Sequence, residues 1–195
     1  MNSKKKAKPD ISLSDEELVL SLQQVMDADR FGLLYDRYTV RVYQKCMGMV
    51  RDKDIAKDLT HDIFLKAFVN LKKFDHRSKF GTWLYTITYN YCLDHLRKGQ
   101  RQRTTQVDEA VELPQEEERR YEVELLSMRS DQLPAVLEQL DPGDRAVLLM
   151  KYQDELSIKE MMEILELGES AVKMRIMRSR ERALAKYREL YRDIS

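Results

Sequence analysis

The chain is poor in the residue types that build extended, cross-linked or metal-stapled proteins. Its 195 residues include only 6 Gly, 4 Pro and 2 Cys. So little Gly and Pro excludes a collagen-like or low-complexity chain. Cys46 and Cys92 form no CxxC pair and have no histidine at ligand spacing, so one chain cannot build a disulfide framework or a structural zinc site from them. We expect two core cysteines, no metal and no cofactor.

Long apolar runs are also absent. The longest, Ala146–Met150, is far shorter than the ~20 residues that span a bilayer. The basic start with Lys4, Lys5, Lys6 and Lys8 leads into no hydrophobic segment of a signal peptide. We therefore expect a cytoplasmic protein without membrane insertion.

The composition is instead that of a soluble helical protein, with 43% hydrophobic and 35% charged residues. Apolar residues recur at the helical period in several segments, and no stretch alternates as a β-strand does. Ser14 with Glu17, and Ser157 with Glu160, form capping boxes, and Asp52 is a further N-cap. The sequence predicts an all-α fold.

Two small helical domains account for this pattern. Residues 12–98 are expected to form the first domain, and residues 131–195 the second. Residues 99–130 are polar and rich in Gln and Glu, which predicts an acidic flexible linker. The apolar stripe expected to form the core of the first domain comprises Leu18, Leu22, Val25, Met26, Phe31, Leu34, Tyr35, Tyr38, Val42, Cys46, Met49, Ile55, Leu59, Ile63, Ala67 and Leu71.

Charges of the two signs are segregated along the chain, although 34 Lys and Arg balance 34 Asp and Glu. Residues 1–100 hold 18 bases against 13 acids, whereas residues 101–140 hold 5 against 10. Residues 170–192 hold eight bases against only Glu181 and Glu189. A locally basic helix of this kind is typical of nucleic-acid binding, despite the net charge of zero.

A helix-turn-helix is predicted near the C-terminus. The acidic helix opened by Ser157 is followed by a short turn that contains Gly168, and then by a long basic helix from about Ser170 to Arg192. This order is that of a positioning helix and a recognition helix. The alternative is a solvated basic face with no role in DNA binding.

The helical period assigns the two sides of the basic helix. Val172, Ile176 and Ala183 are expected to face inward. The opposite side near the helix start would meet base edges in the major groove, and it carries Ser170, Lys173, Met174, Met177 and Arg178. Beside that side, and suited to phosphates, lie Arg175, Arg180 and Arg182.

Two sets of motifs, in order along the chain, resemble a known family. The first set is FGLLY at 31–35, DLTHDIF at 58–64, FDHRS at 74–78, TWL at 82–84 and residues 90–97. The second is residues 137–140, DRA at 144–146, AVK at 171–173 and residues 175–182. Together they resemble the second and fourth regions of bacterial RNA polymerase sigma factors of the extracytoplasmic-function (ECF) group. The resemblance implies an alternative sigma factor, not an enzyme, that binds core RNA polymerase and directs promoter-specific transcription initiation.

The resemblance also implies site residues. The helix that docks on core polymerase would contribute Asp58, Leu59, His61, Asp62 and Phe64. The pocket for a base flipped from single-stranded minus-10 DNA would be formed by Phe74, His76, Arg77, Ser78, Lys79 and Phe80, whose aromatic and basic side chains suit stacking and phosphate contact. The upstream edge of that element would lie along Asn90, Asp94 and Arg97.

Duplex minus-35 DNA would be read, by the same resemblance, through Ser170, Lys173, Met174, Arg175, Met177, Arg178 and Arg182. The family further implies an anti-sigma protein as a partner, and a linker that runs through the channels of the polymerase. A solvated tether is the alternative for the linker.

Three positions depart from the family pattern. His61 stands where Gln is usual, Glu166 where the turn commonly has Gly, and Gly168 where a capping Ser is common. Gly is still an acceptable N-cap, so we expect the turn to form.

Three other readings compete. His61-Asp62 is the dipeptide of a metal-dependent phosphohydrolase, but only 3 His are present in all, too few for such a site. A one-component regulator would use the helix-turn-helix to bind duplex operator without polymerase. A helical scaffold without a DNA role fits the net charge but not the segregation of charges.

Overall fold

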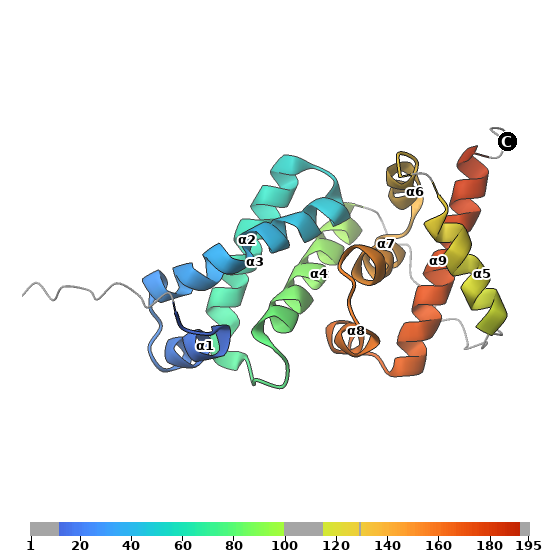
Figure 1. Ribbon diagram of the computed structural model, residues 1–195. Coiled ribbons are helices and arrows are strands. Elements are labelled where there is room, and N and C mark those ends of the chain that lie inside the picture. The colour runs from blue at the N-terminus through green and yellow to red at the C-terminus, as the bar shows by residue number, and fades with distance from the viewer. Residues whose placement is uncertain (1–11, 100–114, 129, 192–195) are drawn as a thin grey trace, which may run out of the picture. The chain divides into compact units, whose positions relative to one another are not determined.

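The computed structural model of the chain describes residues 12–99, 115–128 and 130–191 (Figure 1). All regular structure within these residues is helical, which confirms the predicted all-α class. The chain divides between Tyr91 and Cys92 into two compact units. The division therefore falls inside a helix and earlier than residue 98, where the first domain was predicted to end.

The first unit is built from α1 (Asp15–Gln24), α2 (Ala28–Val50), α3 (Lys53–Asn70), the short 3-10 helix η1 (Leu71–Lys73) and the part of α4 (Phe80–Gly99) that precedes Cys92. Polar side chains start the first three helices. Ser14 and Glu17 form the predicted capping box, and Asp27 and Asp52 accept hydrogen bonds from backbone N–H groups of α2 and α3. α2 and α3 lie side by side and form the centre of the unit (Figure 1).

Most of the apolar positions predicted for this core are buried. Val25 and Ile55 are exceptions, with exposures of 67% and 36%. Val25 follows the last residue of α1, and on α3 the neighbouring Ala56 faces inward instead of Ile55. Fully buried are Leu18, Leu22, Leu34, Val42, Cys46, Met49, Ile63, Ala67 and Leu71.

Tyr38 of α2 joins three helices. Its hydroxyl donates a 2.5 Å hydrogen bond to Asp15 at the start of α1, and its ring packs edge-on against Phe80 and Tyr85 of α4. Burial, and then the bond to Asp15, raise the pKa of the Tyr38 hydroxyl. A Cβ atom on Gly81 would lie 3.1 Å from the Tyr38 hydroxyl oxygen, so glycine permits this close approach.

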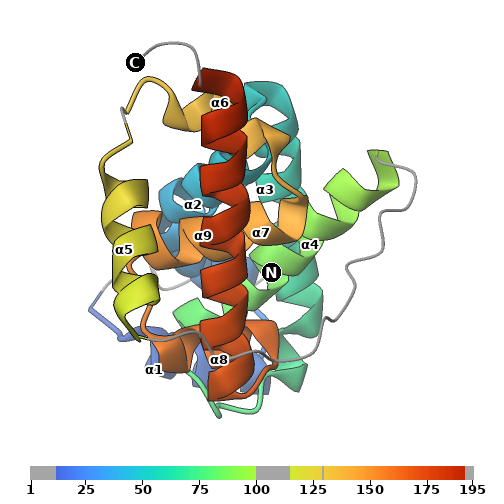
Figure 2. The ribbon, with the colours of Figure 1, turned by 90° about the vertical axis from the view of Figure 1, so that its right-hand side faces the viewer.

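The second unit contains α5 (Gln115–Leu126), α6 (Leu133–Gln139), α7 (Pro142–Leu148), the π-helix η2 (Leu149–Gln153) that continues α7, α8 (Ile158–Leu165) and α9 (Glu169–Tyr191). The helices α5, α6, α7 and α8 all pack against α9, which is the axis of the unit (Figure 2). A cluster of buried apolar residues holds α5, α6 and α7 on α9: Leu125, Val136, Leu140, Leu148 and Ala183.

The structure corrects the predicted flexible linker over residues 99–130. Its C-terminal part is α5, which packs along α9 and places Leu125 in the core cluster. Glu122 and Glu124 of α5 pair with Arg180 and Arg188 of α9 at 3.2 and 2.6 Å. This segment therefore belongs to the second unit, while residues 100–114 lie outside the described part of the chain.

We expect Gly81→Ala to destabilise the first unit by about 1–3 kcal/mol, because the added methyl group would overpack against Tyr38. Gly32→Ala is the matched control, since a Cβ atom there meets nothing within 4 Å. Alanine is favoured over glycine inside a helix by about 1 kcal/mol, so this control should be stabilised. Gly81 also lies in a helix, so the same preference for alanine offsets part of the overpacking cost there. Urea unfolding of both variants measures the difference, and a Gly81→Ala variant stabilised as much as Gly32→Ala would contradict the packing.

Candidate functional site

The predicted docking residues of α3 divide between its two sides. Asp58, His61 and Asp62 are exposed. Leu59 and Phe64 are only 4% and 3% exposed. The Phe64 ring packs against Phe31 and Tyr35 of α2, with centroid distances of 6.4 and 4.6 Å. Leu59 and Phe64 are therefore core residues, and their predicted place at a surface is corrected.

Two apolar side chains that the sequence reasoning missed lie on the exposed side of α3. Leu65 is 52% and Val69 is 74% exposed. Asp58, Asp62, Leu65 and Val69 follow one another at intervals of one helical turn, so they share one face. The same period that identified the core stripe, shifted to the opposite side of the helix, would have found them.

Asp62 is also tied to α4. The hydroxyl of Tyr91 donates a 3.0 Å hydrogen bond to the carboxylate of Asp62, and the ammonium group of Lys66 lies 5.3 Å from the centroid of the Tyr91 ring. Burial, followed by the bond to Asp62 and its charge, raises the pKa of Tyr91. Asp62 and Lys66 on the exposed side of α3 thus both contact Tyr91 of α4.

The loop between η1 and α4 is supported by aromatic rings that point inward. Phe74 and Phe80 are only 5% and 1% exposed, and both pack against Trp83, at centroid distances of 5.2 and 5.8 Å. The expectation that Phe74 and Phe80 offer free stacking surfaces is corrected, because their rings are already enclosed. His76, Arg77 and Lys79 are exposed, while Ser78 is half-buried.

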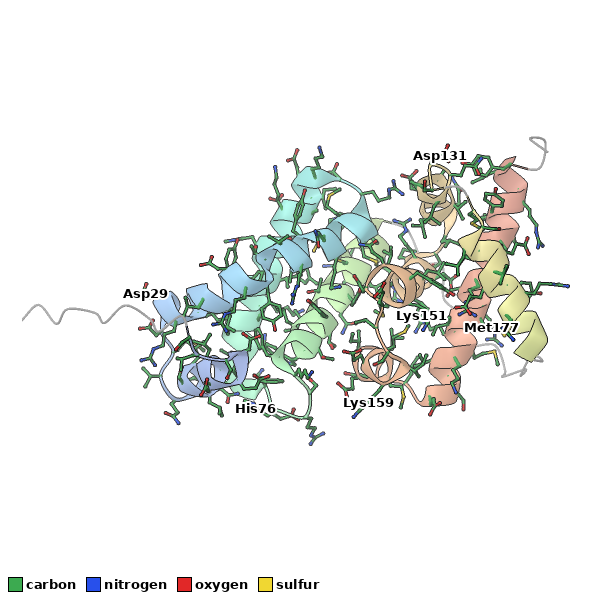
Figure 3. The ribbon with its side chains drawn as sticks, viewed as in Figure 1. Asp29, His76, Asp131, Lys151, Lys159 and Met177 are labelled. Carbon is green, nitrogen blue, oxygen red and sulfur yellow. The ribbon has the colours of Figure 1, made fainter. Side chains whose placement is uncertain are left out.

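His76 marks the tip of this loop (Figure 3). Its φ of 59° places it in the left-handed region, which is unfavourable for most residues with a side chain. The ring of His76 lies 4.7 Å from that of Phe74. The loop therefore presents polar and basic side chains over an aromatic base.

Asn90, Asp94 and Arg97 are all exposed on α4. Their spacing of four and three residues puts them on one face, as predicted. That this face contacts DNA remains a prediction.

The helix-turn-helix has the predicted local structure. Ser157 and Glu160 form the capping box of α8, which ends at Glu166 in the left-handed conformation with φ 55°. The carbonyl of Gly168 accepts the first bond of α9 from Val172. Glu166 therefore adopts the conformation that glycine commonly supplies, at a cost of about 1 kcal/mol or more.

On α9, Val172, Ile176 and Ala183 are buried, which confirms the predicted inward face. Ser170 and Lys173 are exposed, and Met174, Arg175 and Arg178 are half-buried. Met177, labelled in Figure 3, is only 5% exposed, so its predicted place on the reading side is corrected. It lies one turn before Arg180, whose side chain faces α5 and η2.

Two arginines expected to suit phosphates have acidic partners within the second unit. The Nε of Arg180 donates to the hydroxyl of Tyr152, and its Nη2 donates to Glu122 at 3.2 Å. The Nη1 of Arg182 donates to both carboxylate oxygens of Asp144 at 2.9 Å. The side chain of Arg180 is 9% exposed, whereas that of Arg182 is 44% exposed. Arg180 is therefore a structural residue, and Arg182 has one open side.

Lys173 pairs with Glu169 one turn earlier, at 2.6 Å. The hydrogen bond and the charge of Lys173 lower the pKa of Glu169. Any contact of Lys173 with DNA would have to compete with this exposed acid.

Comparison with known proteins gives the family. Two family profiles match the chain, Sigma-70 region 2 over residues 34–102 and Sigma-70, region 4 over residues 130–182. The ECF RNA polymerase sigma factor SigW of Bacillus subtilis is 33% identical over 84% of this chain and 92% of its own length. The chain belongs to the ECF group of the sigma-70 family. It is an alternative sigma factor, which directs transcription initiation.

Other relatives agree. The ECF RNA polymerase sigma-E factor of Escherichia coli is 30% identical over 87% of this chain and 92% of its own length. Among solved structures, CnrH in complex with the cytosolic domain of CnrY has a TM-score of 0.61 and 25% identity, covering 93% of this chain and 99% of that one. RpoE in complex with the anti-sigma factor NepR from Bartonella quintana shares the fold, with a TM-score of 0.56 and 19% identity over 85% of this chain and 98% of that one.

Members of this family are transcription initiation factors without catalytic activity of their own. In the described ranges of this sigma factor, no group of three or more His, Cys, Asp or Glu side chains could hold a metal ion. No helix among the described residues is both long and apolar enough to cross a membrane.

We expect Arg180→Ala to lower the stability of the second unit by about 1–3 kcal/mol, because it removes the bonds from the guanidinium to Tyr152 and Glu122 and leaves these two only their long 3.5 Å bond to each other. Lys173→Ala is the control, since an exposed pair such as Lys173 with Glu169 contributes only ~0–1 kcal/mol. Denaturant unfolding of the two variants tests the difference. If Arg180→Ala unfolds like the parent, its assignment as a structural residue is wrong.

Proposed function

We propose that the sigma factor divides its work between the two units. The first unit docks on core polymerase and captures single-stranded minus-10 DNA, and the second reads duplex minus-35 DNA. The observation that carries this proposal is the placement of exposed polar side chains on α3, on the loop at residues 74–80 and at the start of α9, the three places where family motifs occur.

The exposed face of α3 supports the docking role. It combines the acidic Asp58 and Asp62 with the apolar Leu65 and Val69, while the core side of the same helix is filled. Apolar contacts in the centre and charges nearby are the usual composition of a specific protein interface. Leu65 and Val69 replace Leu59 and Phe64 in the proposed contact.

We expect Asp62→Arg to weaken binding of core polymerase, because it reverses a charge within the proposed contact. Tyr91→Phe is the matched control, since it removes the hydrogen bond to Asp62 but leaves the carboxylate in place. Titration of each variant with purified core polymerase gives the affinities. Unchanged affinity of a folded Asp62→Arg variant would remove Asp62 from the contact.

The loop at 74–80 supports the minus-10 role in a different way from the one the sequence suggested. Phe74 and Phe80 form its base, and His76, Arg77 and Lys79 project from it. Exposed cationic groups neutralise phosphates of a single strand, and the His76 ring can stack on a base. Asn90, Asp94 and Arg97 are exposed further along α4.

The start of α9 supports minus-35 reading. Ser170, Lys173, Met174 and Arg178 lie on the side away from the buried Val172 and Ile176. Arginine makes bidentate bonds to guanine, and the apolar Met174 can contact a thymine methyl group. Arg175 and the open side of Arg182 are placed beside them for phosphates.

Arg178→Ala should cost about 1–3 kcal/mol at one base pair of the minus-35 element and relax the preference there. Arg175→Ala should weaken all promoters alike, because a phosphate contact carries no sequence information. Transcription from a library of randomised minus-35 hexamers, with holoenzyme assembled from each variant, measures both effects. Identical preferences in the two variants would show that the reading side is assigned to the wrong residues.

The remaining partners follow from the relatives. RpoE was solved with an anti-sigma factor, and we propose that an anti-sigma protein also controls this chain. We further propose that it acts in the cytoplasm, without a cofactor and without enzymatic activity. Run-off transcription with core polymerase tests the whole proposal, because a one-component regulator would bind duplex DNA alone and would not support initiation.

A further inference from the structure

Helix α1 lies outside both ranges that match the family, which begin at residues 34 and 130, yet it contacts the loop proposed to capture DNA. The contact is made by the half-buried side chain of Gln23. Its amide nitrogen donates to the carbonyl oxygen of Leu71 at 3.0 Å and to that of Phe74 at 2.7 Å. Its amide oxygen lies 2.8 Å from Nε2 of His76.

These three bonds fix the orientation of the amide. Carbonyl oxygens only accept hydrogen bonds, so the nitrogen of Gln23 must face Leu71 and Phe74. The amide oxygen is then an acceptor, and the proton shared with His76 belongs to Nε2 of the imidazole. One glutamine therefore bonds to the beginning of the loop and to its tip.

The far end of the loop is held from the other end of α1. Asp15 accepts a bond from the hydroxyl of Tyr38, whose ring packs against Phe80, the first residue of α4. Asp15 also pairs with Arg37 at 2.6 Å, which fixes α1 on α2. Both ends of the loop are thus linked to α1, one directly through Gln23 and the other through the bond between Asp15 and Tyr38.

The conformation of His76 shows why the loop needs this support. A left-handed φ of 59° is unfavourable for histidine, and the exposed ring of His76 is held by its contact with Phe74 and by the hydrogen bond to Gln23. The hydrogen bond to Gln23 joins the His76 ring directly to α1. Without it, the tip is free to adopt more favourable backbone conformations.

We propose that Gln23 is a positioning residue for minus-10 recognition: it holds His76 and the following basic residues of the loop in the arrangement that receives a DNA base. This inference rests on the proposed role of the loop. Gln23 need not touch DNA or polymerase, because it acts through the backbone of Phe74 and the ring of His76.

The test uses full-length protein in holoenzyme and compares four variants. Gln23→Leu removes all three bonds, and Gln23→Glu keeps the shape but presents carboxylate oxygens to two carbonyl oxygens. Gln24→Leu is the matched control on the same helix, since Gln24 is exposed. Lys79→Ala tests the role of the loop itself. Core affinity, thermal unfolding, permanganate reactivity of promoter thymines and base preference across a randomised minus-10 element are measured for each.

We expect both Gln23 variants to bind core polymerase like Gln24→Leu but to reduce open-complex formation about 5- to 30-fold, the factor that corresponds to about 1–2 kcal/mol. Preference at one base of the minus-10 element should relax, with the minus-35 preference unchanged. A merely structural role would not shift base preference at a single position.

Three results would overturn the inference. If both Gln23 variants melt promoters like Gln24→Leu while Lys79→Ala melts them poorly, the loop has its proposed role and Gln23 does not position it. If core affinity and thermal stability fall in parallel with melting, Gln23 only stabilises the unit. If Lys79→Ala also behaves like the parent, the role of the loop fails, and the positioning role of Gln23 fails with it.

Discussion

The hydrogen bond from the Tyr38 hydroxyl to Asp15 is the interaction on which the first unit depends. A buried phenol hydroxyl needs a hydrogen-bond acceptor, and a partly buried carboxylate needs a donor. The bond between Tyr38 and Asp15 therefore lowers the free-energy cost of burying both groups. Arg37 and the N-terminal end of α1 complete the compensation of Asp15. Since the Tyr38 ring also packs against Phe80, this bond sets the position of α4, and with it the loop that precedes it.

In the second unit, several charged side chains of α9 form ion pairs that stabilise the packing of its helices. Arg180 reaches Tyr152 and Glu122, Arg182 reaches Asp144, and Arg188 reaches Glu124. These contacts fix α5 and α7 on α9. Several of the basic side chains of α9 are therefore already paired within the unit. The residues that we propose to contact DNA are those near the start of the helix.

Local signals in the sequence were reliable where a single helix decides the outcome. The capping boxes at Ser14 and Ser157 formed as predicted, because their partners are three residues away. The docking positions came from the family resemblance, which conflicts at Leu59 with the helical period: the period places Leu59 in the core stripe, and Leu59 and Phe64 are both buried. Helix α5 was missed because Glu and Arg dominate its residues, although Leu125 lies in the core cluster.

The all-α class, the main helices and the helix-turn-helix could be predicted from caps and helical periods, and the sigma-factor family from motifs that resemble its second and fourth regions. Neither kind of signal shows which aromatic rings of the loop are enclosed, which arginines of α9 are already paired, or that Gln23 reaches His76 from 53 positions away. A helical period states which side chains share a face, whereas burial and hydrogen bonding depend on what a distant segment places against that face.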